Sequence, residues 1–227
     1  MTDYFTQIKI RIDESMFIKD PDSSEIGKNI ISGSISLIDK IGFEAFTIKK
    51  LGLEIGSPES TIYRYFENKQ KILIYLINWY WCWLEYRLIF DTANIPSPEE
   101  KLKTAISLLT EPVREDSDFL HVNEVTLYRI VTQQSSKVYN TQEVDNDNKK
   151  GLFEVYKRIV LRVGEMVLAV NPKFQYPGML ISSVIEAANK QHFFSEYLPA
   201  ITEAEMGDSK IPDFFVRMVL NTINERE

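Results

Sequence analysis

The sequence predicts an all-α protein with a small N-terminal domain, a long connecting helix and a larger C-terminal helical bundle. Apolar residues recur at helical spacing along most of the 227 residues, and residues that cap helices stand before several of these stripes. Prolines punctuate the C-terminal part at Pro172, Pro177, Pro199 and Pro212. We therefore expect domains at residues 22–70 and 71–227, preceded by an arm or short hairpin at residues 1–21.

Composition and charge are those of an ordinary globular protein. The chain has 26 Lys and Arg against 33 Asp and Glu, a formal net charge of −7, which argues against polybasic binding and places function in a local site. A single cysteine, Cys82, excludes an internal disulfide and fits a reducing compartment. There is no signal-peptide pattern and no run of about 18 apolar residues, so we expect a cytoplasmic protein without a membrane association.

The small domain begins with a predicted helix over residues 22–41. Asp22 is the expected cap, and Glu25 at the third helical position completes a capping box. Apolar residues follow one face of this helix, namely Ile26, Ile30, Leu37, Ile38 and Ile41. Gly42 is expected to end the helix.

A second, shorter helix is predicted to begin at Thr47. The Thr47 hydroxyl can cap it, while Phe46 and Leu51 make a hydrophobic staple around the cap. Gly56 then provides the permissive backbone that a tight turn needs.

A third helix is predicted immediately after that turn. Ser57 is its expected cap, and Pro58 occupies the first helical position, where its missing N–H costs nothing. Ile62 and Phe66 form its apolar stripe. Polar and aromatic side chains are left to face elsewhere, namely Glu59, Ser60, Thr61, Tyr63, Arg64 and Tyr65. Two short helices joined in this way indicate a helix-turn-helix, whose second helix enters the major groove of DNA.

The run from Lys28 to Leu73 resembles the DNA-binding domain of TetR-type transcriptional regulators. Its landmarks occur in order and without gaps, namely Gly42-Phe43, Thr47, Leu51-Gly52, Gly56, Thr61-Ile62-Tyr63, Tyr65-Phe66, Asn68-Lys69 and Ile72-Leu73. The resemblance implies a DNA-binding surface of Thr47, Ser57, Pro58, Glu59, Ser60, Thr61, Tyr63, Arg64, Tyr65 and Lys69, with Lys71 also near phosphates. Family members usually carry alanine in place of Gly52 and a Val-Ser pair in place of Ser57-Pro58, which leaves the base preference open.

The charge of this domain is weak for a protein that binds nucleic acid. From Asp22 to Gln70 there are six Lys or Arg against seven Asp or Glu, and Arg64 is the only cation of the third helix. Most DNA affinity comes from neutralising phosphates. We therefore expect modest binding by one domain, a shallow salt dependence and two copies acting together.

Alternation of apolar and polar residues over residues 6–12 predicts a β-strand, which a turn at 13–15 would join to a second strand at 16–18. This hairpin could be an arm that brings Lys9, Arg11 and Lys19 to DNA phosphates, or a flap that covers the DNA-binding domain. We favour the flap, because acidic residues crowd the same stretch.

A long helix over residues 69–90, capped by Asn68, is expected to join the two domains and to act as a lever between them. It is apolar nearly all round, which indicates burial on all sides. Its aromatic residues and those of later helices could line an effector pocket, formed by Trp79, Trp83, Tyr86, Tyr128, Phe153 and Tyr156. Such a pocket suits a flat or amphipathic, poorly charged molecule. The alternative is that these aromatics are ordinary core.

Further helices are expected at residues 98–111, 117–139, 143–170, 178–198 and 211–224. The last two are more apolar than outer helices of a monomer need, and TetR-like proteins dimerise through their last two long helices. The resemblance thus implies a dimer interface of Ile181, Val184, Ile185, Ala188, His192, Phe215, Met218, Val219 and Thr222. The alternative is that these residues close the bundle.

Catalytic and metal chemistry finds little support in the sequence. His121, His192 and Cys82 lack the spacing of a zinc site, and residues 145–156 lack the glycine and glutamate of a calcium loop. We expect no cofactor and no enzymatic activity. The leading hypothesis is a homodimeric, ligand-responsive repressor that binds a pseudo-palindromic operator. The alternatives are a helical protein-interaction module, and a helical enzyme or a lipid or small-molecule carrier.

Overall fold

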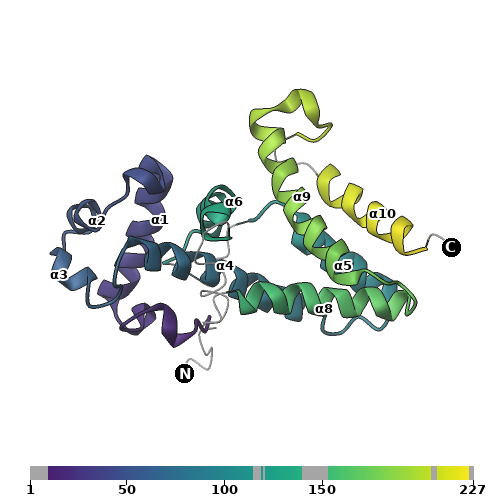
Figure 1. The fold of residues 1–227 in the computed structure, drawn as a ribbon, viewed down its shortest axis with the longest axis horizontal. Coiled ribbons are helices and arrows are strands. Elements are labelled where there is room, and N and C mark those ends of the chain that lie inside the picture. Colours follow the sequence, from purple (N-terminus) through teal and green to yellow (C-terminus); the bar gives the residue numbers. More distant parts are fainter. Residues whose placement is uncertain (1–9, 115–118, 120, 140–152, 206–208, 225–227) are drawn as a thin grey trace, which may run out of the picture. The chain divides into compact units, whose positions relative to one another are not determined.

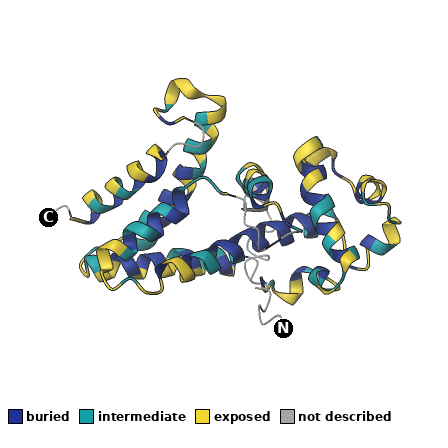
Figure 2. Ribbon diagram, turned by 180° about the vertical axis from the view of Figure 1, so that it is seen from behind, coloured by how far each residue is buried: buried dark blue, intermediate teal, exposed yellow. Residues whose placement is uncertain are grey.

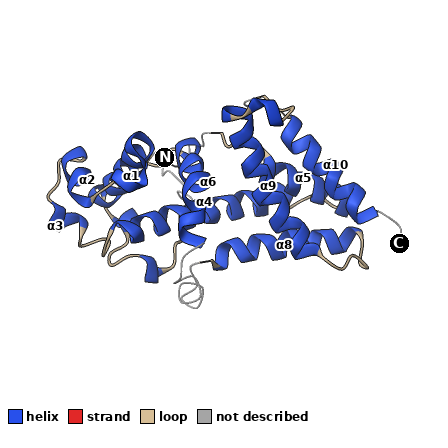
Figure 3. Ribbon diagram, turned by 45° about the horizontal axis from the view of Figure 1, so that its top comes forward, coloured by secondary structure: helices blue, strands red, loops and turns tan. Residues whose placement is uncertain are grey.

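The computed structural model describes residues 10–114, 119, 121–139, 153–205 and 209–224, and every regular element in this part of the chain is helical (Figures 1 and 3). The α-helices are α1 (Glu25–Ala45), α2 (Ile48–Glu54), α3 (Glu59–Ile62), α4 (Lys69–Thr92), α5 (Pro98–Thr110), α6 (Glu124–Tyr139), α8 (Glu154–Val170), α9 (Pro177–Tyr197) and α10 (Lys210–Asn224). Short 3-10 helices are η1 (Glu14–Met16), η2 (Pro21–Ser23) and η3 (Pro199–Ile201). The predicted all-α class is confirmed.

The chain divides into two compact units. The head unit comprises Met1–Trp83 and Val113–Glu154, and the bundle unit comprises Leu84–Pro112 and Val155–Glu227. Helix α4 contributes its residues 69–83 to the head unit and 84–92 to the bundle unit. The predicted DNA-binding domain therefore lies in the head unit together with α6.

The predicted N-terminal hairpin is wrong for the described residues. Residues 10–12 and 16–18 form no strand, and the expected turn is part of η1, which Asp13 caps by accepting a hydrogen bond from the Ser15 amide. Positions 6–9, including Lys9, lie outside the described residues. Ile10 and Met16 are buried in the head unit.

Helix α1 begins later than expected because Ser24, and not Asp22, is its cap. The Ser24 hydroxyl accepts a hydrogen bond of 3.2 Å from the Gly27 amide. Asp22 instead lies within η2. At the other end Gly42 leaves the helical conformation with a φ of 76°, as the expected stop requires, before one more turn leads to Ala45.

Helix α4 is buried over most of its length, as its apolar sequence predicts (Figure 2). The Asn68 side chain caps it by accepting a hydrogen bond of 3.0 Å from the Lys71 amide. Burial is incomplete near the C-terminal end, where Ile89 and Phe90 are 45% and 71% exposed. The expectation of burial on all sides thus holds only for the part of the helix before Ile89.

The bundle unit is built from α5, α8, α9, α10 and the end of α4, and α10 packs on both α5 and α9. Helix α5 is capped by Ser97 as predicted. In the head unit, α6 begins at Glu124 rather than at residue 117, because the Asn123 side chain accepts a hydrogen bond of 2.8 Å from the Thr126 amide. The helix expected from residue 143 is seen from Glu154, and residues 140–152 lie outside the described residues.

Candidate nucleic-acid interface

Helices α2 and α3 form the predicted helix-turn-helix. The Thr47 hydroxyl caps α2 by accepting a hydrogen bond of 3.2 Å from the Lys50 amide, and Phe46 and Leu51 are fully buried around this cap. Gly56 makes the turn with a φ of 64°, a conformation that favours glycine. Both local predictions are confirmed.

Helix α3 is shorter than the predicted third helix and begins one residue later. Pro58, not Ser57, stands at its cap position, and neither side chain caps it. Beyond Ile62 the chain continues as tight turns, in which the Arg64 amide bonds to the Thr61 carbonyl and the Tyr65 amide to the Ile62 carbonyl. These turns bring Ile62 and Phe66 into the core, where both are fully buried.

Most of the predicted DNA-binding side chains face solvent. The exposed members are Thr47, Pro58, Glu59, Ser60, Tyr63 and Arg64, and Ser57 and Thr61 are half-buried. Tyr63 is 47% exposed, which leaves its ring free to meet another molecule. Because buried Ile62 and Phe66 bracket Tyr63 and Arg64, the core fixes the segment that presents these two side chains.

The structure contradicts the assignment of Tyr65 to the DNA-facing surface. Tyr65 is only 2% exposed, and its hydroxyl is hydrogen-bonded to the Ser24 hydroxyl at 2.8 Å. This hydrogen bond lowers the pKa of the Tyr65 hydroxyl, and the nearby Lys19 ammonium acts in the same direction. Tyr65 stands three residues after the buried Ile62, a spacing that places both side chains near one face, and its contact with Ser24 holds it inward.

Lys69, like Tyr65, makes its contacts within the head unit. Its ammonium donates hydrogen bonds of 3.2, 3.3 and 3.2 Å to the carbonyls of Phe43, Glu44 and Phe46, and it lies 4.8 Å from the centre of the Phe43 ring. These contacts neutralise the C-terminal end of α1. The side chain is therefore engaged within the head unit, contrary to its predicted contact with phosphate. Lys71 stays a predicted phosphate contact.

The structure explains why this chain has Gly52 where members of the TetR-type family usually have alanine. A Cβ atom at this position would lie 2.6 Å from the backbone oxygen of Ser57, closer than real Cβ contacts. The Gly52 carbonyl also accepts a hydrogen bond of 2.8 Å from the Ser57 amide. The turn of this helix-turn-helix thus approaches α2 so closely that only glycine fits.

We expect Gly52→Ala to lower the free energy of unfolding by up to about 2 kcal/mol, because displacing the turn costs about 1–3 kcal/mol and the better helix propensity of alanine recovers about 1. Gly164→Ala in α8 is the matched control, since its Cβ would meet only ordinary contacts at 3.5 Å and beyond. Gly164→Ala should raise the free energy of unfolding. Urea unfolding of both proteins tests the pair, and a stabilised Gly52→Ala would contradict the tight turn.

The structure distributes the predicted effector residues over both units. Trp79, Trp83, Tyr128 and Phe153 belong to the head unit, and Tyr86 and Tyr156 to the bundle unit. Trp79 and Trp83 are 1% and 0% exposed, as core residues are. Burial raises the pKa of the Tyr128 hydroxyl. It also raises the pKa of Tyr156 to about 12, with a further contribution from the Glu186 carboxylate. A shared pocket for the six residues stays a prediction.

Gln134 is a candidate effector contact that the sequence reasoning missed. It is 9% exposed in α6, and its side-chain oxygen finds no hydrogen-bond donor. Val131 and Leu127 are buried one and two turns earlier on the same face. A glutamine that interrupts an apolar stripe was the available signal, because a buried amide without a partner costs free energy unless another group satisfies it.

The predicted dimer interface is largely contradicted. Six of its nine members are at most 2% exposed within a single chain, namely Ile181, Val184, Ile185, Ala188, Phe215 and Val219. They close the bundle unit, which was the alternative interpretation. Met218 is half-buried and Thr222 is exposed, so both remain available to a partner. On each of the two helices, packing within the chain uses the stripe that was expected to face a second copy.

Other apolar side chains on α9 and α10 are exposed. On α9 these are Met179, Phe193 and Tyr197, with exposures of 70%, 41% and 52%, and on α10 it is Phe214, at 58%. Phe214, Met218 and Thr222 follow one another at one-turn intervals and so share one stripe of α10. These residues are the corrected candidates for a surface between two copies.

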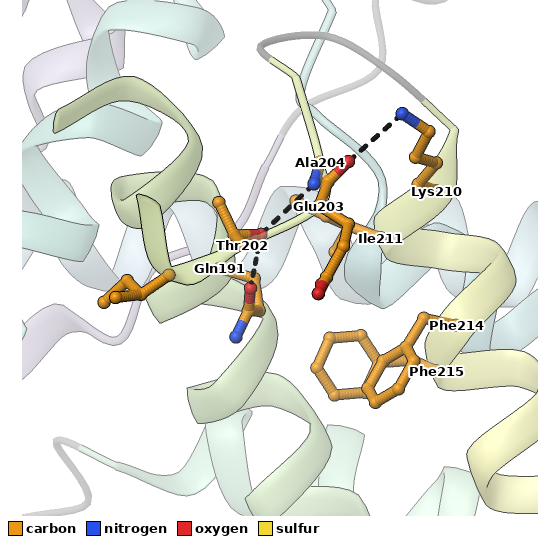
Figure 4. A pocket seen from close by; sticks show the side chains of 9 residues that line it. Gln191, Thr202, Glu203, Ala204, Lys210, Ile211, Phe214 and Phe215 are labelled. Atoms are coloured by element: carbon orange, nitrogen blue, oxygen red, sulfur yellow. Dashed lines mark hydrogen bonds between the residues drawn. The ribbon is translucent and has the colours of Figure 1, made fainter. Parts of the chain in front are cut away.

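A cavity of about 180 Å³ lies between the end of α9, residues 201–204 and the start of α10 (Figure 4). The Thr202 hydroxyl donates to the Gln191 side-chain oxygen at 2.8 Å, and the Lys210 ammonium donates to the Glu203 carbonyl at 3.1 Å. Phe214 and Phe215 form part of its apolar wall. It is smaller than the about 300–1,000 Å³ typical of ligand pockets, and these polar groups bind one another. It is therefore a poor effector site.

His192 is held inside the bundle unit rather than offered to a partner. Its Nε2 donates a hydrogen bond of 2.8 Å to the Thr110 carbonyl. Burial lowers the pKa of His192, although the hydrogen bond to Thr110 opposes this shift.

Because the folded state holds His192 neutral, protonation should destabilise it. Above the unfolded pKa of about 6.5 the protein keeps its full stability, and stability is lost as the pH falls through the folded pKa. His192→Asn should therefore lose less stability than the natural protein between pH 7.5 and 5.5. Denaturant titrations at both pH values measure the difference, and equal losses in the two proteins would contradict the effect of burial.

Residues 30–76 match the sequence profile described as bacterial regulatory proteins, tetR family. No curated protein matches the sequence. Among solved structures, the fatty acid degradation regulator FadR from Bacillus halodurans is 14% identical, with a TM-score of 0.58 over 87% of this chain and 96% of that one. AibR, solved with isovaleryl coenzyme A and operator DNA, is 15% identical, with a TM-score of 0.58 over 83% and 95%. A regulator from Saccharomonospora viridis in complex with choline is 14% identical, with a TM-score of 0.60 over 89% and 98%.

These structural likenesses show the fold over most of the chain. Among the described residues, no group of three or more His, Cys, Asp or Glu is arranged to hold a metal ion. No helix in the same residues combines the length and the hydropathy that a membrane span requires.

Proposed function

We propose that this chain is a TetR-type transcriptional regulator that acts in the cytoplasm as a ligand-responsive repressor and binds operator DNA as a homodimer, because residues 30–76 match the tetR-family profile. The observation that carries the proposal is the exposed pair Tyr63 and Arg64, held at the end of a helix-turn-helix by the buried residues on either side. Binding, and not catalysis, is the activity that this arrangement supports.

The exposed surface of the helix-turn-helix suits a DNA groove in shape and chemistry. Arg64 can contact a guanine edge or a phosphate, Tyr63 can pack against bases or donate to a phosphate, and Ser60 and Thr61 can contact base edges. Exposed Lys49 adds a second cation on α2. The few cations favour a dimer, because two modest contacts on one duplex bind far more tightly than either does alone.

The corrected surface on α9 and α10 supports the homodimer. A two-fold interface is formed by the same patch on both copies, so each exposed aromatic or methionine side chain of that patch contributes to the interface twice, once from each copy. Met179, Phe193 and Tyr197 on α9, with Phe214 and Met218 on α10, are the residue types enriched in such interfaces.

An effector site is proposed within the head unit, around Trp79, Trp83 and Tyr128, with Gln134 as a polar contact. The unsatisfied Gln134 oxygen would accept a hydrogen bond from the ligand, and the tryptophans would surround its apolar part. The similarity to AibR, solved with isovaleryl coenzyme A and operator DNA, supports an effector of partly apolar character. The effector must bind one state of the dimer better than the other to release DNA.

Selection of duplex DNA from a random pool at low salt, followed by titration of the selected duplex, tests the proposal. We expect an inverted repeat bound by two chains. No enrichment by the folded protein would contradict operator binding and favour the protein-interaction module, for which the near balance of charges in residues 22–70 is the supporting observation.

A further inference from the structure

The segment before α1 holds the end of the helix-turn-helix. We define the strap as residues 16–24, which include η2. The Ile18 amide donates a hydrogen bond of 2.8 Å to the Tyr65 carbonyl, and the Ser24 hydroxyl is hydrogen-bonded to the Tyr65 hydroxyl at 2.8 Å. The Lys19 ammonium lies 5.1 Å from the centre of the same ring. Tyr65 thus meets the strap through its backbone, its hydroxyl and its ring.

The strap also meets the loop before α6. The Asp22 carboxylate lies 3.1 Å from Nε2 of His121, and the two side chains are 12% and 23% exposed. His121 is three residues from the start of α6 at Glu124. Asp22 is held in place because its amide donates a hydrogen bond of 2.9 Å to the Asp20 carboxylate. One short segment therefore contacts both the helix-turn-helix and the start of α6.

Between these two contacts the strap is stiff and closely packed. Pro21 fixes the backbone of η2 and is buried. It approaches α1 so closely that a Cβ atom on Gly27 would lie 2.1 Å from the Pro21 oxygen. Phe17 packs edge-on against Tyr75 of α4, with ring centres 6.1 Å apart. A displacement of Asp22 would therefore be carried along the strap, because the backbone has little freedom to absorb it.

On one side, the start of α6 meets α1 across a cleft lined by polar and apolar residues rather than across a close-packed contact. This cleft has a volume of about 440 Å³, and its lining includes Ser32, Ser36, Asn123 and Thr126. One ion pair, Arg129 with Asp39 at 2.9 Å, joins α6 to α1 directly. Hydrated polar surfaces can separate at lower cost than close-packed apolar ones. The side of the start of α6 that lines this cleft can therefore shift at lower cost than the side that packs in the core, where Glu124 and Leu127 are fully buried.

We propose that the strap transmits the position of the start of α6 to the DNA-reading segment, with the Asp22–His121 pair as the joint and Tyr65 as the positioning residue. The inference rests on the proposed function, since Tyr128 and Gln134 of α6 are among the proposed effector contacts. A ligand that moves α6 then acts on Tyr65, and through it on Tyr63 and Arg64, with which it shares the turns after Ile62.

Asp22→Asn is the first test, because it removes the charge of the joint and keeps the size of the side chain. Asp39→Asn is the matched control. It removes the same charge from the ion pair of Asp39 and Arg129, which joins α1 to α6 outside the strap. We expect Asp22→Asn to weaken binding of the selected operator roughly fivefold and Asp39→Asn to leave it unchanged. His121→Gln should reproduce the effect of Asp22→Asn.

Hydrogen exchange followed by mass spectrometry supplies a second readout. In Asp22→Asn, amide exchange should accelerate in the peptides that cover the strap and residues 59–66, and in Asp39→Asn it should not. Bound operator should slow exchange in the strap of the natural protein, because coupling between two sites is reciprocal.

Tyr65→Phe tests the other end of the strap by removing only the hydroxyl bonded to Ser24. It should weaken operator binding, and its effect should be less than additive with that of Asp22→Asn if both act through one strap. Additive effects, or equal effects of Asp22→Asn and Asp39→Asn, would overturn the inference while the natural protein still binds its operator. A natural protein that selects no operator would overturn the proposed function as well.

Discussion

Replacing Arg64 or Tyr63 by alanine should abolish most of the specific binding to the selected operator. A side chain that contacts a base edge or phosphate contributes about 1–3 kcal/mol, and each head of a dimer loses it. The dimer then loses about 2–6 kcal/mol, which is at least a roughly 30-fold rise in dissociation constant. Fluorescence anisotropy with labelled duplex measures the change. The fold should persist, because both side chains face solvent.

Two comparisons separate this effect from general ones. Lys173→Ala removes the same charge as Arg64→Ala from an exposed position in the bundle unit, and it should leave operator binding unchanged. Arg64→Ala should also reduce the slope of log affinity against log salt by about one per head if Arg64 meets a phosphate. Unchanged binding by both head variants would refute the assignment of this segment to the groove.

Phe214→Ala and Phe215→Ala should have opposite effects on assembly and on folding. Phe215 is 1% exposed in the core of the bundle unit, and its loss should cost about 3–5 kcal/mol of unfolding free energy. Phe214 is 58% exposed, so its loss should cost little stability in the monomer. If Phe214 packs against a second copy, its truncation should raise the dimer dissociation constant roughly tenfold or more.

Sedimentation velocity over a range of concentrations measures the assembly of both variants, and denaturant unfolding measures their stability. The neighbouring phenylalanines control for each other, because the chemical change is the same and only the direction of the side chain differs. A Phe214→Ala protein that remains as dimeric as the natural protein at every concentration would move the interface away from this stripe of α10.

Local signals in the sequence were sufficient for much of the fold. Thr47, Gly56, Asn68 and Ser97 each have the structural role expected of a cap or turn residue, because their effect depends on the few residues around them. The spacing of apolar residues gave the helical class for the same reason. The exposed pair Tyr63 and Arg64 followed from knowing which neighbours form the stripe.

Side-chain direction near the end of a short helix could not be predicted in the same way. Tyr65 was expected to face DNA, but it lies in the core, where the strap binds its carbonyl and its hydroxyl. Asp22 and Ser24 are two residues apart and both can cap. Ser24 is the cap in the structure, and two longer-range contacts go with this. The Ser24 hydroxyl also bonds Tyr65, and Asp22 contacts His121, 99 residues later.

The sequence by itself determined the helical class, the helix-turn-helix and the resemblance of this domain to TetR-type regulators, because these depend on patterns within some 50 consecutive residues. Only the tertiary structure decided which apolar stripe is core and which is surface. Ile181, Val184 and Phe215 are as apolar as Met179 and Phe214, yet the first group packs within the chain and the second faces outward. An apolar side chain favours burial wherever it stands in the sequence, and the arrangement of the neighbouring helices determines what buries it.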